Sequence, residues 1–342
     1  MLAIVGSTGR TGTLVAEEAA RRGIDLLLVG RNREALAAQA GRFGCRFAAV
    51  SLQRQDELVA ALRPADAVLN VAGPFADTAL PVLTAAARAR THYLDLSNDL
   101  EPVRAVLARD RQLLEAGIVA LPAAGFGTVA TDGLARLLVD AVPDAVRIEL
   151  GIAIGADGQS PGVAASTRQV LASGARRLVE GRLERAPIGR GAFRAPADGP
   201  TLVPVGLADL AVTPATTGVD TVTVGVAVPL PRWSAPVLLP VLSAAMRGAR
   251  PTAARGRTRE PVSRAWARVV RPDGSEESAW LTAGEGFRFS ADSAVTAAQL
   301  VLGGGVRPGA ATVSGRYGAV FLAGLRGVRI DSTLGDGRRP GA

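Results

Sequence analysis

The sequence predicts an α/β fold: a Rossmann-type, doubly wound parallel sheet, followed by a second α+β domain with a mixed sheet that would bind a substrate. Two observations lead to this prediction. Short aliphatic runs alternate with helix-like segments over residues 1–122, a pattern typical of parallel strands joined by right-handed helical crossovers. The first run also ends in a glycine-rich turn, residues 6–12, of the kind that opens a dinucleotide-binding sheet.

The glycine-rich turn follows the apolar run 2–5 and precedes a helix with one apolar face. Its glycines are three residues apart, so that Gly6 permits a sharp exit from the strand and Gly12 permits close packing of the helix. Gly9 removes a side chain where a diphosphate would approach the backbone, and the N–H groups at the helix start would face that diphosphate. A tight turn with no ligand is the alternative. The predicted cofactor contacts in this turn are Gly6, Ser7, Thr8, Gly9, Arg10, Thr11 and Gly12.

The end of the second aliphatic run, residues 24–29, indicates which dinucleotide binds. An acidic residue at this place accepts hydrogen bonds from the ribose hydroxyls of NADH and repels the 2′-phosphate of NADPH. Here the run is followed by Gly30 and Arg31, and a guanidinium can pair with a phosphate through two hydrogen bonds. The sequence therefore predicts NADPH as the cofactor, with Arg31 and Asn32 as contacts. The alternative is that Arg31 lies in solvent at the start of the next helix.

Four further runs complete the expected sheet. They occupy residues 46–50, 67–71, 92–96 and 118–121, and helices are expected at 33–43, 55–62, 80–89 and 101–116. Ligands of such sheets lie beyond the carboxyl ends of the strands. The segments that follow the third-last and second-last strands should therefore face the cofactor near its nicotinamide. They add Ala72, Gly73, Pro74, Phe75 and Ser97 to the predicted contacts.

Several of these motifs, in this order and spacing, resemble the saccharopine-dehydrogenase-like reductases, a family that includes trans-acting enoyl reductases of lipid and polyketide pathways. The matching segments are GSTGRTG (6–12), GRN (30–32), AGPF (72–75), THYLDLSND (91–99), LPAAGFGTVATD (121–132) and ADSAVTAAQLVLGGGVRPG (291–309). The last segment resembles the helix by which such chains return to their first domain. The resemblance implies an NADPH-dependent oxidoreductase that transfers hydride to an activated double bond, an enoyl C=C or a carbonyl, of an acyl, polyketide or lipid-like substrate.

The chain departs from the family at two loops that flank the expected substrate cleft. Asn98-Asp99 stands where relatives carry Gly-Glu, and Ala130-Thr131-Asp132 stands where they carry Pro-Ser-Asp. Substrate identity therefore does not follow from the resemblance. Two alternatives remain open: a saccharopine-type reductase of an amino-acid-derived imine, and an NADPH-binding regulatory protein without turnover.

The domain boundaries follow from the same segments. We expect an NADP-binding domain over residues 1–122, completed by a returning segment over 291–330, a substrate domain over 123–290, and a flexible tail over 333–342. The elements expected in the substrate domain are helices at 132–142 and 163–180, strands at 146–154 and 221–228, a hairpin of 265–270 with 277–282, and a long loop or lid at 185–217. The apolar run 235–246, which follows Trp233, should form a helix buried against the sheet. Lining an acyl cleft or resting on a membrane surface are the alternatives for this run.

Few side chains near the expected nicotinamide could move a proton. Tyr93, Asp95 and Asp99 cluster around the end of the 92–96 run and are the predicted catalytic residues. His92 has a suitable intrinsic pKa, but it opens a strand and is expected to pack sideways. The predicted substrate contacts are Phe126, Asp132 and Arg168. For Arg168 a solvated helix face is the alternative.

The composition excludes several kinds of chemistry. All 39 basic residues are arginine, which excludes a Schiff-base lysine, a GKS or GKT phosphate loop and the Tyr-Lys pair of short-chain dehydrogenases. The single cysteine and single histidine exclude disulfides within the chain and metal centres built from two histidines. We therefore expect no metal cofactor.

The net charge of +8 could attract a phosphorylated substrate, an acidic carrier protein or nucleic acid, although a solvated arginine surface explains it as well. No nucleic-acid motif accompanies the charge. We therefore expect a small-molecule or acyl substrate, which a carrier protein could present, no nucleic-acid partner, and a homodimer as the candidate assembly. No apolar run is long enough to span a bilayer, and no secretory signal precedes the first strand, so a cytoplasmic protein is expected.

Overall fold

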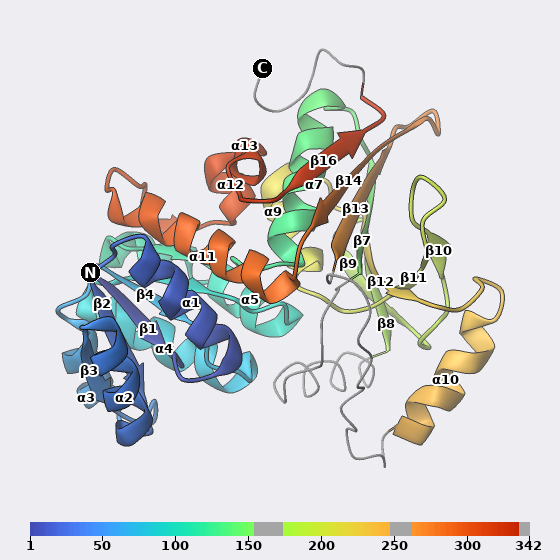
Figure 1. The fold of residues 1–342 in the computed structure, drawn as a ribbon. Helices are drawn as coiled ribbons and strands as arrows, with labels where there is room; N and C mark the ends of the chain where they lie inside the picture. Colours follow the sequence, from blue (N-terminus) through green and yellow to red (C-terminus); the bar gives the residue numbers. More distant parts are fainter. Residues whose placement is uncertain (154–173, 247–261, 335–342) are drawn as a thin grey trace. The chain divides into compact units, whose positions relative to one another are not determined.

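The structure, a computed structural model, describes residues 1–153, 174–246 and 262–334, without the side chains of 241–246. By its contacts the chain divides into two units (Figure 1). The first consists of Met1–Phe126 and Phe287–Val313, and the second of Gly127–Gly286 and Ser314–Ala342. The returning segment predicted at 291–330 therefore contributes to the first unit only as far as Val313.

The sheet of the first unit is doubly wound and parallel, as the sequence predicts. Its strand order is β15-β6-β5-β4-β1-β2-β3, and every neighbouring pair is parallel. The chain runs outward from β1 to β3 and then returns to start again at β4, so the topological switch point lies between β1 and β4. The strands are β1 (Leu2–Val5), β2 (Leu26–Gly30), β3 (Arg46–Ala49), β4 (Ala67–Asn70), β5 (His92–Asp95), β6 (Val119–Leu121) and β15 (Gly309–Ala310).

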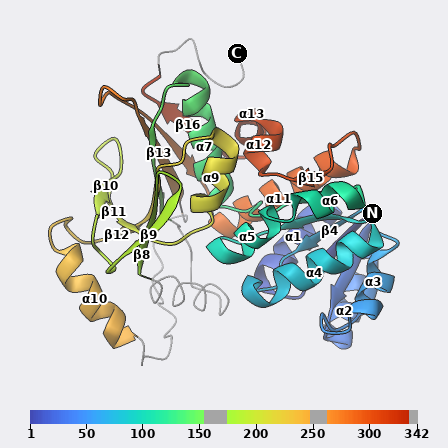
Figure 2. The same cartoon turned by 180° about the vertical axis from the view of Figure 1, so that it is seen from behind.

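Helices cover both faces of this sheet. Figure 1 shows α1 and α11 over one face, and Figure 2, from behind, shows α4 and α6 over the other. The helices are α1 (Arg10–Arg21), α2 (Arg33–Phe43), α3 (Gln55–Leu62), α4 (Phe75–Ala89), α5 (Leu100–Leu107), α6 (Asp110–Ala116) and α11 (Gly286–Leu302). Because both faces are covered, the strands consist of continuous apolar runs, and β1 is buried at each of its positions.

The single helix predicted at 101–116 is wrong, because the chain breaks between α5 and α6. Arg109 leaves the helical conformation, with φ −93° and ψ 12°. Its guanidinium turns back to donate a hydrogen bond to the carbonyl of Ala105, at 2.8 Å. The break lets Asp110 begin a new helix and accept the N–H of Ala310 in β15, also at 2.8 Å. The helix is thus interrupted where Asp110 bonds to a residue 200 positions away in the sequence, although the local apolar periodicity continues through this point.

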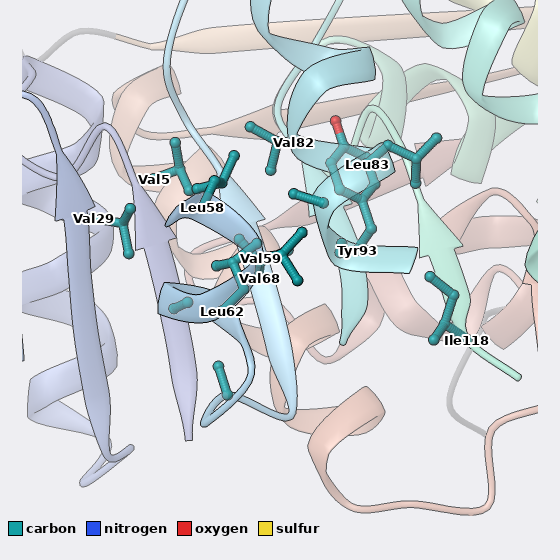
Figure 3. Close-up of a cluster of buried hydrophobic side chains, with 14 of the residues drawn as sticks. Val5, Val29, Leu58, Val59, Leu62, Val68, Val82, Leu83, Tyr93 and Ile118 are labelled. Atoms are coloured by element: carbon teal, nitrogen blue, oxygen red, sulfur yellow. The ribbon is translucent and has the colours of Figure 1, made fainter. Parts of the chain in front are cut away.

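The core of the first unit includes a cluster of buried aliphatic side chains between the sheet and helices α3 and α4 (Figure 3). Val5, Val29 and Val68 from the strands pack with Leu58 and Val82 from the helices. Burial of one such side chain stabilises the fold by roughly 1.5 to 3 kcal/mol. This cluster therefore holds the carboxyl ends of β1 and β4, where the switch point lies.

Helix α11 is part of the first unit because α1 holds it through a buried ion pair. The Arg22 guanidinium of α1 pairs with Asp292 and donates hydrogen bonds to Thr296, at 2.9 Å, and to Gln299, at 2.7 Å. At the other edge of the helix, Ser293 donates to the carbonyl of Ala124 at 2.8 Å. The returning helix predicted from 291–309 thus exists and begins at Gly286.

The second unit contains a mixed sheet in the order β10-β11-β12-β7-β13-β14-β16, with β8 pairing both β12 and β9. Its one parallel pair joins β12 and β7. The strands are β7 (Arg147–Ala153), β8 (Ala175–Val179), β9 (Arg182–Ala186), β10 (Phe193–Arg194), β11 (Thr201–Pro204), β12 (Val222–Val228), β13 (Ser263–Val270), β14 (Glu276–Ala283) and β16 (Arg329–Ser332). The helices are α7 (Thr128–Ala141), α9 (Asp209–Thr217), α10 (Ala235–Met246), α12 (Val313–Tyr317) and α13 (Val320–Ala323).

The helix predicted at 163–180 is wrong where the structure describes it. Residues 163–173, with Arg168, lie outside the described residues, and 175–179 form strand β8. The cause is a tight turn between β8 and β9: Glu180 has φ +47° and Gly181 has φ +73°, the pair of positive φ values that a two-residue hairpin needs. That hairpin pairs Val179 with Arg182.

Three further expectations for the second unit are corrected. The long loop expected at 185–217 contains β10, β11 and α9, since Leu202 and Val203 are buried in the sheet. The apolar helix at 235–246 is not buried along its first turn: Ala235 is buried, but Val237 is 68% exposed and Leu238 is 43% exposed. The tail predicted from 333 starts later, because the N–H of Thr333 donates to Ser278 of β14 at 2.9 Å. Residues 335–342 lie outside the described part of the chain.

Candidate functional site

The turn after β1 has the backbone that a dinucleotide site needs. Gly6 has φ +87°, which a residue with a side chain rarely adopts. At Gly12, an added Cβ would lie 2.2 Å from the carbonyl oxygen of Gly6, so the helix approaches the turn too closely for any side chain. At Gly9, by contrast, an added Cβ would meet only that oxygen, at 3.5 Å. The space beside Gly9 is therefore open for a ligand.

The polar groups of this turn also fit a phosphate group. Ser7 is fully buried, and its hydroxyl has no hydrogen-bond partner among the described residues. No side chain caps the N-terminus of α1 at Gly9, so its first N–H groups keep the character of an anion site. The turn is held from outside: Thr13 donates to the carbonyl of Gly9 at 3.0 Å, and Gln39 donates to that of Ser7 at 3.0 Å. The residues present therefore suit a bound diphosphate.

Two predicted arginines lie beside this turn on neighbouring elements. Arg31 follows β2 and is exposed, and no ion pair or hydrogen bond within the described ranges engages its guanidinium. The Arg10 guanidinium, at the start of α1, lies 4.4 Å from the centre of the Phe287 ring. Asn32 is used locally, because its Oδ1 caps α2 by accepting the N–H of Ala35 at 3.1 Å. Arg31 is thus the side chain with the position and freedom to meet a 2′-phosphate.

The loop after β4 lies against the glycine turn. A Cβ added at Gly6 would lie 2.8 Å from the Cβ of Ala72, so the predicted contacts from β1 and β4 come together at the switch point. After Ala72 the chain passes through a cis Gly73–Pro74 peptide bond. Gly73 and Pro74 are exposed, and Phe75 begins α4. The structure thus brings the two predicted cofactor loops into one crevice.

The predicted catalytic pair, Tyr93 and Asp95, is sealed inside the first unit. Both residues are fully buried, and the Tyr93 hydroxyl donates to Asp95 Oδ2 at 2.7 Å. Asp95 Oδ1 accepts the N–H groups of Ser97, at 2.9 Å, and Ala123, at 2.8 Å. Burial raises the pKa of Asp95, and these hydrogen bonds pull that pKa back down. The geometry shows Asp95 tying the loops after β5 and β6 together, and a catalytic role stays a prediction.

The neighbouring titratable groups are also engaged or buried. Burial raises the pKa of Asp99, whose side chain lies at the start of α5. Burial lowers the pKa of His92, and its Nδ1 accepts the N–H of Val119 at 3.1 Å, so His92 packs sideways as expected. Ser97 accepts the N–H of Asp99 at 3.2 Å and is buried, so its predicted contact with the cofactor stays a prediction.

The predicted substrate residues do not form one group. Phe126 is buried in the first unit and packs edge-on against Phe289, with ring centres 5.1 Å apart. Arg168 lies outside the described residues. Asp132 belongs to α7 of the second unit, where it is buried beside Asp209 of α9. Phe126 and Asp132 thus belong to different units, and a shared role stays a prediction.

Asp132 has a strongly perturbed environment. Its Oδ2 accepts a hydrogen bond from Thr216 at 2.8 Å, while its Oδ1 has no hydrogen-bond partner among the residues described. Burial raises the pKa of Asp132 to about 7; the charge of Asp209 adds to this, and the hydroxyl of Thr216 opposes it. Asp132 can therefore keep a proton near neutral pH, although only 1% of its surface is exposed.

Sequence reasoning missed three polar residues that the structure makes important: Asn70, Thr78 and Asp209. Each is buried, and each bonds to a predicted site residue or its neighbour. The signal for Asn70 was visible, since an amide ends an otherwise aliphatic strand.

Within the described ranges, no three His, Cys, Asp or Glu side chains gather as metal ligands would, and no helix combines the length and apolarity that a membrane crossing needs.

Comparisons with known proteins agree with this geometry. Residues 2–121 match the family model of the saccharopine dehydrogenase NADP binding domain. Two curated relatives from two strains of Mycobacterium tuberculosis, each named "Putative trans-acting enoyl reductase", are 32% identical over 141 residues, which cover 38% of this chain and 33% of the relative. The matched part of the chain thus spans about a third of the length of these relatives.

The whole fold also has a solved counterpart. The chain is similar to apo, histidine-tagged saccharopine dehydrogenase (L-Glu forming) from Saccharomyces cerevisiae, with a TM-score of 0.65 and 13% identity over 97% of this chain and 99% of that one. The predicted fold class, a doubly wound parallel sheet with a second mixed sheet, is confirmed by this similarity and by the strand order. The predicted NADP cofactor is confirmed by the family match. Over residues 2–121 the chain is therefore similar to saccharopine dehydrogenase NADP binding domains.

Proposed function

We propose that the protein is an NADPH-dependent oxidoreductase that transfers hydride to an activated double bond, an enoyl C=C or a carbonyl, of an acyl, polyketide or lipid-like substrate. The observation that carries the proposal is the NADP binding domain with its open turn at Gly9 and its unpartnered Ser7 hydroxyl. The names of the Mycobacterium tuberculosis relatives support an enoyl substrate. A carrier protein could present the acyl chain.

Each part of the crevice has a role in this proposal. NADPH supplies the hydride when it is bound. The turn from Gly6 to Gly12 binds its diphosphate through backbone N–H groups, and Arg31 binds the 2′-phosphate. The loop from Ala72 to Phe75 shapes the crevice beyond the end of β4. In this proposal the first unit therefore selects NADPH over NADH and orients its nicotinamide for hydride transfer.

Reduction of an enoyl group also needs a proton at the carbon next to the carbonyl, or on the enolate oxygen. Asp99 and Asp132 both have a raised pKa, which favours the protonated form that an acid catalyst requires. Tyr93 and Asp95 bond to each other and would need to part before either could donate. Among these groups, Asp132 has a pKa that burial raises to about 7.

The first test is a titration of the protein with NADPH and NADH, followed by cofactor fluorescence. Loss of a charge-assisted phosphate contact in Arg31→Ala should weaken NADPH binding by about ten- to a hundredfold and leave NADH binding unchanged. Arg63→Ala is the matched control: it removes an equally exposed arginine at the end of α3, away from the carboxyl ends of the strands. If Arg31→Ala binds NADPH as the wild type does, the 2′-phosphate assignment fails.

A second candidate is a saccharopine-type reductase that acts on an imine formed from an amino acid and an oxo acid. The observation that favours it is the fold shared with saccharopine dehydrogenase. NADPH oxidation in the presence of enoyl thioesters, compared with mixtures of amino acids and 2-oxo acids, separates the two. Tight NADPH binding with no oxidation by either substrate class would instead favour a regulatory NADPH-binding protein.

A further inference from the structure

We propose that Asn70 and Thr78 are positioning residues of the NADP crevice: they fix the backbone of Ala72 against the glycine turn, and so set the spacing of the two loops that face the cofactor. The proposal rests on NADP binding by the first unit, which is part of the proposed function. Neither residue needs to touch the cofactor for this role.

The first step is that side chains, not strand partners, hold both polar groups of Ala72. Asn70 Oδ1 accepts the N–H of Ala72 at 3.1 Å, and the Thr78 hydroxyl donates to the carbonyl of Ala72 at 2.5 Å. The Asn70 amide donates in turn to the Thr78 hydroxyl at 3.3 Å. Regular pairing ends one residue earlier, where Val71 donates to the carbonyl of Val5 at 2.9 Å. Ala72 is therefore a point at which the loop is fastened after the strand has ended.

The second step is that the fastened residue touches the glycine turn. The ideal Cβ position at Gly6 lies 2.8 Å from the Cβ of Ala72 and 2.9 Å from its Cα and N. A side chain at Gly6 would therefore clash with Ala72, so the turn and the loop lie too close together here for any residue but glycine. The hydrogen bonds of Ala72 to Asn70 and Thr78 hold the loop at this short spacing.

The third step is burial, which makes these hydrogen bonds hard to replace with water. Asn70 is fully buried and Thr78 is 8% exposed. Asn70 also lies in register with Val5 on one side and with Asp95 on the other. It therefore stands between the glycine turn and the buried pair that ties the loops after β5 and β6.

The test compares the whole cofactor with its adenosine half. Thr78→Val keeps the shape of the side chain and removes the hydroxyl. We expect the affinity for NADPH to fall by about tenfold. The affinity for 2′,5′-ADP should stay within about twofold, because this ligand carries the 2′-phosphate that Arg31 would bind and lacks the nicotinamide half. Thr78→Ser, which retains the hydroxyl, should bind NADPH as the wild type does.

Thr91→Val is the matched control. Thr91 is fully buried in the same unit, and its hydroxyl donates to the carbonyls of Leu62 and Ala65 at 3.2 and 3.1 Å. Because Thr91 precedes β5, it lies at the amino ends of the strands, opposite the cofactor loops. It should lower the melting temperature as Thr78→Val does and leave NADPH affinity unchanged. If Thr78→Val fails to fold, Asn70→Ala takes its place, because it leaves the hydrogen bond of Thr78 to the Ala72 carbonyl intact.

Three outcomes would overturn the proposal. Unchanged NADPH affinity in Thr78→Val would show that the loop needs no fastening. An equal loss of NADPH and 2′,5′-ADP affinity, or the same loss in Thr91→Val, would show a general loss of stability. If the wild type itself binds no NADPH, the proposed function fails together with this proposal, and that result is distinct from the other two.

Discussion

The substitution Asp132→Asn tests a buried carboxyl whose pKa is raised to about 7. Asp132 and Asp209 are buried side by side between α7 and α9, with 1% and 2% of their surfaces exposed. Thr131 and Thr216 donate hydrogen bonds to them, and no ion pair within the described ranges offsets their charge. Burial raises the pKa of both carboxyls. A second negative charge in this place is therefore costly, and folding favours a protonated Asp132.

The magnitude follows from the pKa of Asp132. It rises from 3.8 to about 7 on folding, and each tenfold change in proton affinity corresponds to about 1.4 kcal/mol. The folded state therefore binds this proton more tightly than the unfolded chain by about 4 kcal/mol. Because the folded-state pKa is the higher one, stability is greatest at low pH and is lost as the pH rises from 3.8 to about 7. More than half of the loss falls between pH 5 and pH 8.

The assay is urea denaturation at pH 5 and at pH 8. Asn cannot ionise, and its amide oxygen can still accept the hydrogen bond from Thr216. We expect Asp132→Asn to be more stable than the wild type at pH 8, by a few kcal/mol at most, and to lose this advantage at pH 5. The control is Asp140→Asn on the same helix, whose carboxylate is 48% exposed and pairs with Arg136. It should change stability little at either pH. An advantage of equal size at both pH values, or a loss at pH 8, would refute the reasoning.

Two further predictions concern the first unit. Gly12→Ala should abolish NADPH binding in the fluorescence titration, because its Cβ would lie 2.2 Å from the Gly6 carbonyl oxygen. The control is Gly41→Ala in α2, where an added Cβ meets nothing within 4 Å. This variant should bind NADPH normally, and its free energy of unfolding in urea should rise by up to about 1 kcal/mol. Arg22→Met should cost roughly 3 kcal/mol, because it removes the ion pair with Asp292 of α11 and the hydrogen bonds to Thr296 and Gln299. Arg21→Ala, which removes an exposed ion pair with Glu18, should cost below about 0.5 kcal/mol. Similar losses in both variants would show that Arg22 does not hold α11.

The fold of the first unit could be predicted because short, local stretches of sequence specify most of its strands and its glycine turn. Strands β1, β2 and β4 are short aliphatic runs that end at a glycine or a polar residue: Gly6 after β1, Gly30 in β2 and Asn70 in β4. The handedness of crossovers then fixes the order of the strands. The glycine turn was predictable for the same reason, because seven consecutive residues, Gly6–Gly12, carry both the positive φ and the close approach to α1.

The second unit was harder because its strands depend on partners far away in the sequence. The segment 175–179 contains two arginines between aliphatic residues, a pattern that suits an exposed helix as well as an edge strand. Pairing with β9 and with Val222 of β12 decides in favour of the strand. The one local signal was Glu180-Gly181, whose positive φ values close the hairpin. The break at Arg109 likewise depends on β15, which lies near the end of the chain.

The residues of the candidate site likewise fall into two groups, those that local sequence specifies and those that depend on distant partners. The residues that bind by backbone, from Gly6 to Gly12, were predictable from spacing. The buried pairs were not, because Thr131 and Asp209 are 78 residues apart and nothing in either segment indicates the other. Tyr93 and Asp95 were predicted from their proximity to the end of β5, and nothing in the sequence indicated that each side chain finds a buried partner in the other.

Asp132 connects the stability argument to the proposed reaction. A carboxyl that keeps a proton near pH 7 suits protonation of an enolate, and it is also what a buried pair of acids without a cation requires. Both interpretations predict the gain in stability of Asp132→Asn at pH 8, so stability does not separate them. Turnover does: if Asp132 is the acid, Asp132→Asn should bind NADPH normally while kcat falls by about a hundredfold or more. Full kcat in a more stable variant would assign Asp132 to the packing of α7 on α9, and would move the search for the acid to Asp99, whose pKa is also raised by burial.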